Sequence, residues 1–131
     1  MRQASRASPA YVILVGLAGY AVLAGLTVAR WRAGMSVSLL CGAASFLALA
    51  ILVGMHPVRL PGRAGATTTV GFAVDYACLV IFGPAIAAWI GVLSDTVLLR
   101  RSPPLRLAFN HGMLVLSFAV AGSAYQALGG R

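Results

Sequence analysis

Five apolar stretches, separated by short polar or basic segments, dominate the chain. They cover about residues 9–29, 36–55, 66–82, 84–99 and 107–128. An α-helix rises about 1.5 Å per residue, so about twenty apolar residues are needed to cross a bilayer core about 30 Å thick. The pattern therefore predicts an all-α integral membrane protein. We expect a compact bundle of about five transmembrane helices that forms a single domain over residues 1–131.

The third and fourth stretches meet at Gly83-Pro84, which predicts a break between two helices because proline suits the first turn of a new helix. The whole run over residues 67–99 is too long for one crossing and suits two short ones. Its opening Thr67-Thr68-Thr69 can cap a helix or adopt extended backbone. A third segment that enters and leaves on the same side of the membrane is the alternative.

Small residues at four-residue spacing predict where helices approach closely. Ala21, Gly25 and Ala29 share one face of the first predicted helix, which suits close helix contact. The fourth predicted helix carries a similar face that ends in a carboxylate; its members are Gly83, Ala87, Gly91 and Asp95.

Charge supports a membrane protein and an orientation. The chain is 60% hydrophobic and 9% charged, with a formal net charge of +8. Its ten basic residues are all arginines that lie between or beyond the apolar stretches, so they form no stripe for nucleic acid and are placed to meet lipid headgroups. With five spans and a cytoplasmic N-terminus, seven arginines lie inside (2, 6, 59, 63, 100, 101, 106) and three outside (30, 32, 131). The positive-inside rule thus favours five spans and a cytoplasmic N-terminus. The expected location is the bacterial inner membrane, which the chain crosses several times.

The two aspartates are the main candidates for a site, because carboxylates are costly at membrane depth. Asp95 lies on the small-residue face, about one turn from Arg100 and Arg101. It is either part of an ion pair that ties the helix end to the basic loop or a ligand contact inside the bundle. Asp75 lies deeper, on a face shared with Thr67, and has no basic residue within two turns. It is either a functional group or a protonated side chain bonded to a backbone carbonyl.

Four other polar or aromatic residues are weaker candidates. Asn110 is expected to cap the last helix, and His111 to lie in the headgroup layer or to sense pH. His56, before Pro57, marks the end of the second helix. Trp89 lies in mid-span, where it lines a cavity or faces lipid.

Catalysis and metal binding find no support in the sequence. Cys41 and Cys78 lie in apolar stretches and are expected to be reduced thiols. They and the two histidines show no metal-ligand spacing, and no nucleophile–base pair or phosphate-binding loop is evident. We expect no catalytic residue, no metal and no cofactor.

From Arg59 onward the chain resembles the N-terminal membrane module of bacterial HD-GYP and GGDEF proteins, which signal with cyclic di-GMP. The resemblance is carried by Val58-Arg59-Leu60-Pro61, Phe82-Gly83-Pro84, Arg106 with Phe109-Asn110, and the ending Tyr125 to Gly130. In that family the module precedes a cytoplasmic phosphodiesterase or cyclase domain. The 131 residues hold no such domain, so the chain is expected to be a truncated copy or an input module alone.

The stretch from Phe82 to Asp95 is also similar to the substrate-binding subunits of energy-coupling-factor vitamin transporters. There, a Gly-Pro start leads into a helix with small residues and a late aspartate. Those subunits usually have six spans, one more than is predicted here.

We therefore expect a non-catalytic sensory or input module of a bacterial signalling protein. The alternative is a membrane subunit for small-molecule uptake with Asp75 and Asp95 among its ligand contacts, and a purely structural subunit is the third. The expected partners are the lipid bilayer, a small-molecule ligand, and either a cytoplasmic signalling domain or transporter subunits, with no nucleic acid.

Overall fold

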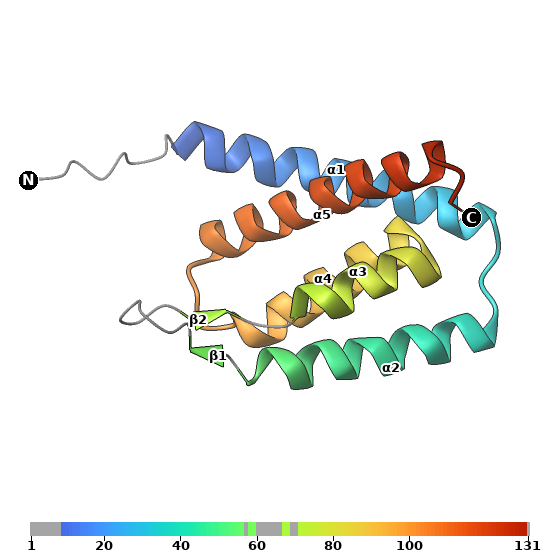
Figure 1. Ribbon diagram of the computed structural model, residues 1–131. Helices are drawn as coiled ribbons and strands as arrows, with labels where there is room; N and C mark the ends of the chain where they lie inside the picture. The colour runs from blue at the N-terminus through green and yellow to red at the C-terminus, as the bar shows by residue number, and fades with distance from the viewer. Residues whose placement is uncertain (1–8, 57, 60–66, 69–70, 131) are drawn as a thin grey trace, which may run out of the picture.

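The computed structural model describes residues 9–56, 58–59, 67–68 and 71–130, and this part of the chain is almost entirely helical. Its elements, in order, are α1 (Pro9–Arg32), α2 (Val37–Gly54), β1 (Val58–Arg59), β2 (Thr67–Thr68), α3 (Gly71–Phe82), α4 (Pro84–Leu98) and α5 (Pro104–Ala127). Successive helices run in opposite directions, so α1 begins and α5 ends at opposite ends of the bundle (Figure 1). The predicted all-helical class is confirmed.

Three of the five helices, α1, α2 and α5, are long and apolar enough to cross a membrane. The other two are shorter: α3 has 12 residues and α4 has 15, which correspond to about 18 and 22 Å. Both fall short of a bilayer core about 30 Å thick. The structure therefore has three candidate spans and a pair of short apolar helices, where five spans were expected, two of them short.

Two of the predicted helix boundaries are wrong by more than two residues at the N-terminal side. The third helix begins at Gly71 and not at Ala66, because Thr67-Thr68 pairs antiparallel with Val58-Arg59. Threonine is β-branched and fits this extended pairing well. The last helix begins at Pro104, three residues before the predicted start, with proline in its first turn.

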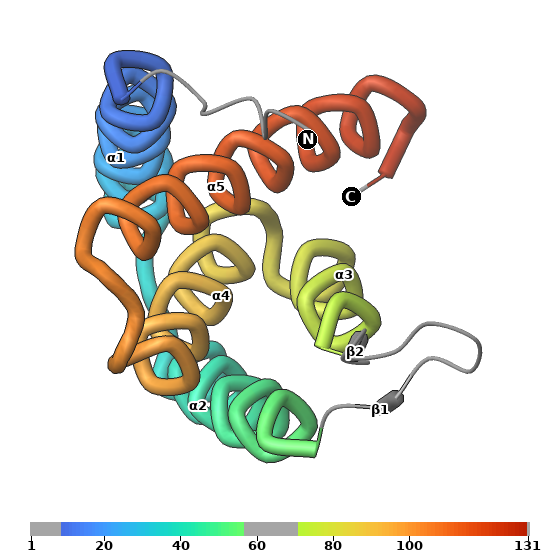
Figure 2. The backbone as a smooth tube through the Cα atoms, turned by 90° about the vertical axis from the view of Figure 1, so that its left-hand side faces the viewer, coloured from blue at the N-terminus to red at the C-terminus, as the bar shows by residue number. Residues whose placement is uncertain are grey.

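Helix α4 lies at the centre of the bundle and packs against each of the other four helices (Figure 2). Its alanines at 87 and 88 are completely buried, and Gly91 faces the side chain of Leu114 on α5. Small side chains allow this close approach of neighbouring helices. The small-residue face expected on this helix is thus a packing face.

Helices α1 and α5 also pack closely, but not through the face expected from the sequence. Gly19 lies against Gly112, where a Cβ atom would meet the backbone of α5 2.9 Å from a carbonyl oxygen. Gly25 instead has no atom within 4 Å of a Cβ built on it, and Ala21 and Ala29 are exposed. The prediction of a contact face at these three positions is wrong within the described chain, because α5 lies against a different side of α1.

The turn between α3 and α4 is a single residue, Gly83. Its φ is +85°, a conformation that glycine adopts without a Cβ penalty. Its N–H donates to the carbonyl of Leu79 at 3.0 Å, and Pro84 starts the next helix. This turn folds α3 back along α4, which places the carboxylates of both helices in the same half of the bundle.

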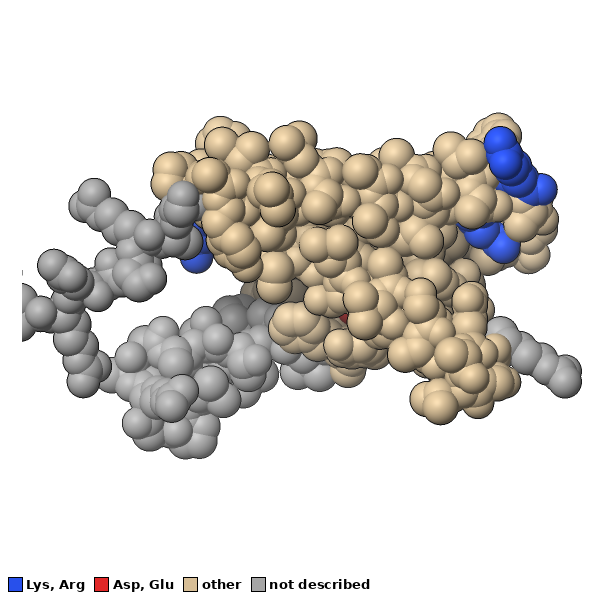
Figure 3. All heavy atoms as spheres, turned by 90° about the horizontal axis from the view of Figure 1, so that it is seen from above, with Lys and Arg blue, Asp and Glu red and all other residues tan. Residues whose placement is uncertain are grey.

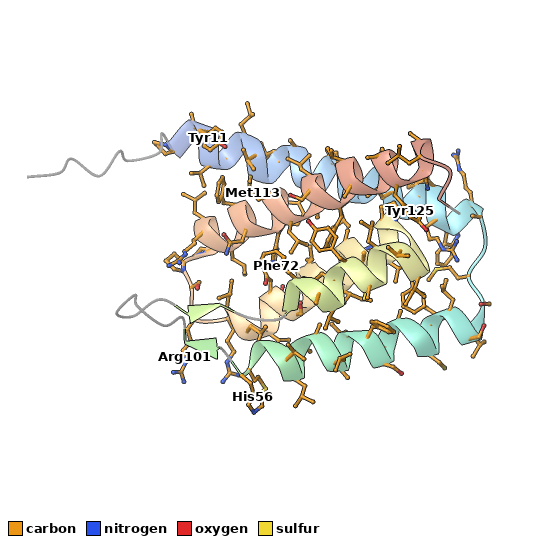
Figure 4. All side chains as sticks on the ribbon, viewed as in Figure 1. Tyr11, His56, Phe72, Arg101, Met113 and Tyr125 are labelled. Atoms are coloured by element: carbon orange, nitrogen blue, oxygen red, sulfur yellow. The ribbon has the colours of Figure 1, made fainter. Side chains whose placement is uncertain are left out.

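Charged groups mark the ends of the bundle. On the face shown in Figure 3, arginine atoms lie at the two ends, and the described surface between them is almost free of charge. Figure 4 shows His56 and Arg101 at one end with Tyr11, and Tyr125 at the other. This banding is typical of a helical bundle whose sides face lipid and whose ends face water.

Candidate functional site

A cavity of about 470 Å³ lies where α3 and α5 diverge over the C-terminal half of α4. This volume falls within the range of small-molecule sites. Four helices contribute its wall, which consists of Ala50, Gly54, Gly71, Phe72, Asp75, Tyr76, Ser94, Asp95, Leu98, Leu99, Asn110, Met113, Leu114, Ser117 and Phe118. In Figure 4 the labelled Phe72 lies between the ribbons of α3 and α5.

Asp75 is the most deeply buried acid of this cavity. It lies in the second turn of α3, and only 8% of its surface is exposed. Its Oδ1 atom is buried and has no hydrogen-bond partner among the described residues. The expectation that it shares a helical face with Thr67 is wrong, because Thr67 belongs to β2. A buried carboxylate oxygen without a partner is costly, so this group needs an explanation.

Asp95 lies opposite, in the last turn of α4, and is half-buried. No salt bridge shorter than 4.0 Å joins it to Arg100 or Arg101, both of which the structure describes. The ion pair that the sequence suggested is therefore not formed. The carboxyl group lines the same cavity as Asp75 instead.

Asn110 also lines the cavity, and the expectation that it caps the last helix is wrong. Because α5 begins at Pro104, this residue lies in the second turn of the helix. The N-cap position belongs to Pro103, which makes no side-chain hydrogen bond to the helix end. Three of the six sequence candidates, from three different helices, meet at one cavity.

Two serines in the wall were missed by the sequence analysis. The hydroxyl of Ser94 donates to the carbonyl of Gly91 at 3.0 Å, and that of Ser117 donates to the carbonyl of Met113 at 2.8 Å. Each serine oxygen keeps lone pairs for a further hydrogen bond. The signal was present in the spacing, because Ser117 lies seven residues after Asn110 and hence on the same helical face.

His111 lies outside this cavity, in a buried polar contact between three helices. Only 4% of its surface is exposed, so other side chains of the bundle enclose its ring. Its Nδ1 atom is 2.8 Å from the hydroxyl of Tyr20 on α1, and its Nε2 atom is 3.4 Å from the hydroxyl of Thr96 on α4. Since Thr96 donates its proton to the carbonyl of Val92, the consistent arrangement has Nε2–H donating to Thr96 and Tyr20 donating to Nδ1.

The remaining candidates are at the surface of the bundle. Trp89 is 39% exposed and lines neither of the two cavities; its indole N–H donates to the hydroxyl of Thr27 on α1 at 2.9 Å. His56 is exposed at the end of α2, with Nδ1 2.9 Å from the carbonyl of Leu52. Both have structural contacts and neither joins the site.

A second cavity of about 490 Å³ lies at the opposite end of the bundle, beside the turn at Gly83. Arg30, Ser123 and Gln126 supply its polar groups. No predicted site residue lines it, so substitutions there are suitable controls for the first cavity.

Metal binding has no candidate cluster in the described chain, where no group of three or more histidine, cysteine, aspartate or glutamate side chains is placed to hold an ion. Cys41 and Cys78 are both free thiols.

Comparisons with known proteins leave the family open. No protein-family model matches the chain, and no curated protein and no solved structure shows significant similarity to it. The two family resemblances therefore stay predictions.

Proposed function

We propose that this protein is a non-catalytic, multi-pass module of the bacterial inner membrane, with its N-terminus in the cytoplasm, that binds a small molecule as the input of a signalling protein. The cavity between α3, α4 and α5 is the binding site. The observation that carries the proposal is Asp75, a carboxylate buried against this cavity with one oxygen that has no hydrogen-bond partner among the described residues. A bound ligand would supply the missing partner.

The position of the cavity supports a sensory role. Its wall comes from α2, α3, α4 and α5, so one ligand touches four helices at once. A ligand that fits one arrangement of these helices better than another shifts the population toward that arrangement. Since α4 contacts every other helix, a shift of its C-terminal half is passed to the whole bundle.

Binding can be tested with the full chain in lipid nanodiscs, by screening a metabolite library for compounds that raise its unfolding temperature. A stabilising ligand is expected for the wild type and for Ser123→Trp, but not for Ser117→Trp, which fills the cavity. These two serines are a matched pair, because both are exposed residues of α5 that donate to the carbonyl four residues earlier. The proposal fails if no compound stabilises the wild type, or if Ser117→Trp responds equally.

A membrane subunit for small-molecule uptake is the second candidate. It is favoured by the stretch from Phe82 to Asp95, which resembles such subunits and supplies two polar residues of the cavity wall, Ser94 and Asp95. For this function, Asp95→Asn should weaken uptake by cells that also contain an energy-coupling ATPase and its membrane subunit. Unchanged uptake with normal membrane insertion would count against it, whereas a signalling module would bind the ligand without transporting it.

A further inference from the structure

The cavity has an unbalanced charge. Two carboxyl groups, Asp75 and Asp95, line it from the neighbouring helices α3 and α4, and no arginine or histidine of the described chain belongs to its wall. His111, whose ring bonds to Tyr20 and to Thr96 beside Asp95, lies outside the wall. Like charges that share a site of low dielectric repel each other, and an opposite charge placed between them removes this cost. The site is therefore best matched by a positively charged group.

The hydrogen-bonding groups of the wall point to the same chemistry. Ionised carboxylates only accept hydrogen bonds, and Asp75 has an oxygen free to do so. The hydroxyl protons of Ser94 and Ser117 are already engaged with backbone carbonyls, so their oxygens act as acceptors toward the cavity. An ammonium group carries several donors and no acceptor, so it suits the oxygens of Asp75, Ser94 and Ser117. The amide of Asn110 in the same wall can donate as well as accept.

The size and the remaining lining favour an organic cation over a bare metal ion. A volume of about 470 Å³ is far larger than one ion requires, and two carboxylates fall short of the ligand cluster that a metal needs. Three aromatic rings, those of Phe72, Tyr76 and Phe118, also line the cavity. Aromatic faces attract organic cations and pack against hydrocarbon.

We infer that the ligand of this cavity is a small organic amine, bound in its protonated form with the ammonium group between Asp75 and Asp95 and the hydrocarbon part against the aromatic rings. This inference rests on the proposed function, because it names the chemical class of the ligand for the same site.

The test compares three compounds of the same shape and different charge: 2-phenylethylamine (a cation), 2-phenylethanol (neutral) and phenylacetate (an anion). Binding is measured by calorimetry on the full chain in nanodiscs of phosphatidylcholine, which carries no net charge. We expect the amine to bind at least about tenfold more tightly than the alcohol, and phenylacetate not to bind, since one charge-assisted hydrogen bond accounts for such a ratio.

Replacing each aspartate by asparagine tests whether the amine binds at this cavity. Asp75→Asn and Asp95→Asn should each weaken binding of the amine by about tenfold or more. Gln126→Ala, in the second cavity at the other end of the bundle, is the control and should leave binding unchanged. Asparagine keeps the size of the side chain, and the unfolding midpoint of each variant verifies that it is folded.

The outcomes separate this inference from the proposed function. Equal binding of the amine and the alcohol, tighter binding of phenylacetate, or no binding of the amine in the millimolar range overturns the inference. If the metabolite library then yields an anionic or neutral ligand whose stabilising effect is lost in Ser117→Trp, the proposed function stands and only the inference about the amine fails. If the library yields no such ligand, both fail.

Discussion

The contact between α1 and α5 allows a sharp test, because two glycines of the same helix differ in their surroundings. In Gly19→Ala the new methyl group would overlap the backbone of Gly112, so the two helices have to separate. In Gly25→Ala the new methyl group meets no atom within 4 Å. The pair compares one substitution at a packed and at an open position of α1.

The magnitude follows from two opposing effects. Alanine favours a helix over glycine by up to about 1 kcal/mol at either position, so this gain cancels in the comparison. Overpacking costs about 1–3 kcal/mol and applies only at Gly19. We therefore expect Gly19→Ala to be less stable than Gly25→Ala by about 1–3 kcal/mol, and Gly25→Ala to equal or exceed the wild type.

The assay is reversible unfolding in mixed micelles titrated with SDS and followed by tryptophan fluorescence. Trp89 reports on α1 directly, since its indole N–H donates to the hydroxyl of Thr27. Equal free energies of unfolding for the two variants, or a more stable Gly19→Ala, would refute the packing of α1 against α5 described above.

Three other predictions can be checked with the same preparation. Asp75→Asn is expected to stabilise the ligand-free protein by about 1 kcal/mol, because it removes a buried charge whose Oδ1 atom has no partner in the described part of the chain. A lower unfolding midpoint for this variant would contradict the prediction. Tyr20→Phe should lower the free energy of unfolding by about 1 kcal/mol, because it removes the hydrogen bond to the imidazole of His111. Tyr11→Phe, at an exposed ring, should leave the stability unchanged. Equal unfolding midpoints for the two variants would show that the bond to His111 does not stabilise the bundle. A small lipophilic thiol reagent should label the exposed Cys41 in the folded protein and reach the buried Cys78 only after unfolding, so equal labelling rates in mass spectrometry would contradict the fold.

The number and order of the helices could be predicted from the sequence, because each apolar stretch specifies a helix through local interactions. Gly83-Pro84 lies where α3 ends and α4 begins, since one residue tolerates a positive φ and the next suits a first turn. The start of α3 could not be predicted in this way. Thr67-Thr68 becomes a strand only because Val58-Arg59, nine residues earlier in the chain, pairs with it.

The candidate site, too, could be predicted only in part from the sequence. Asp75 and Asp95 could be identified from the sequence, because a carboxylate in an apolar stretch is energetically costly and is recognisable from its neighbours in sequence. That they share one cavity with Asn110 depends on how α3, α4 and α5 are rotated about their axes, and local sequence does not encode this rotation. The spacing of small residues was ambiguous for the same reason. Gly19 and Gly25 look alike in an apolar helix, and only the position of α5 decides which of them is a contact and which is open surface.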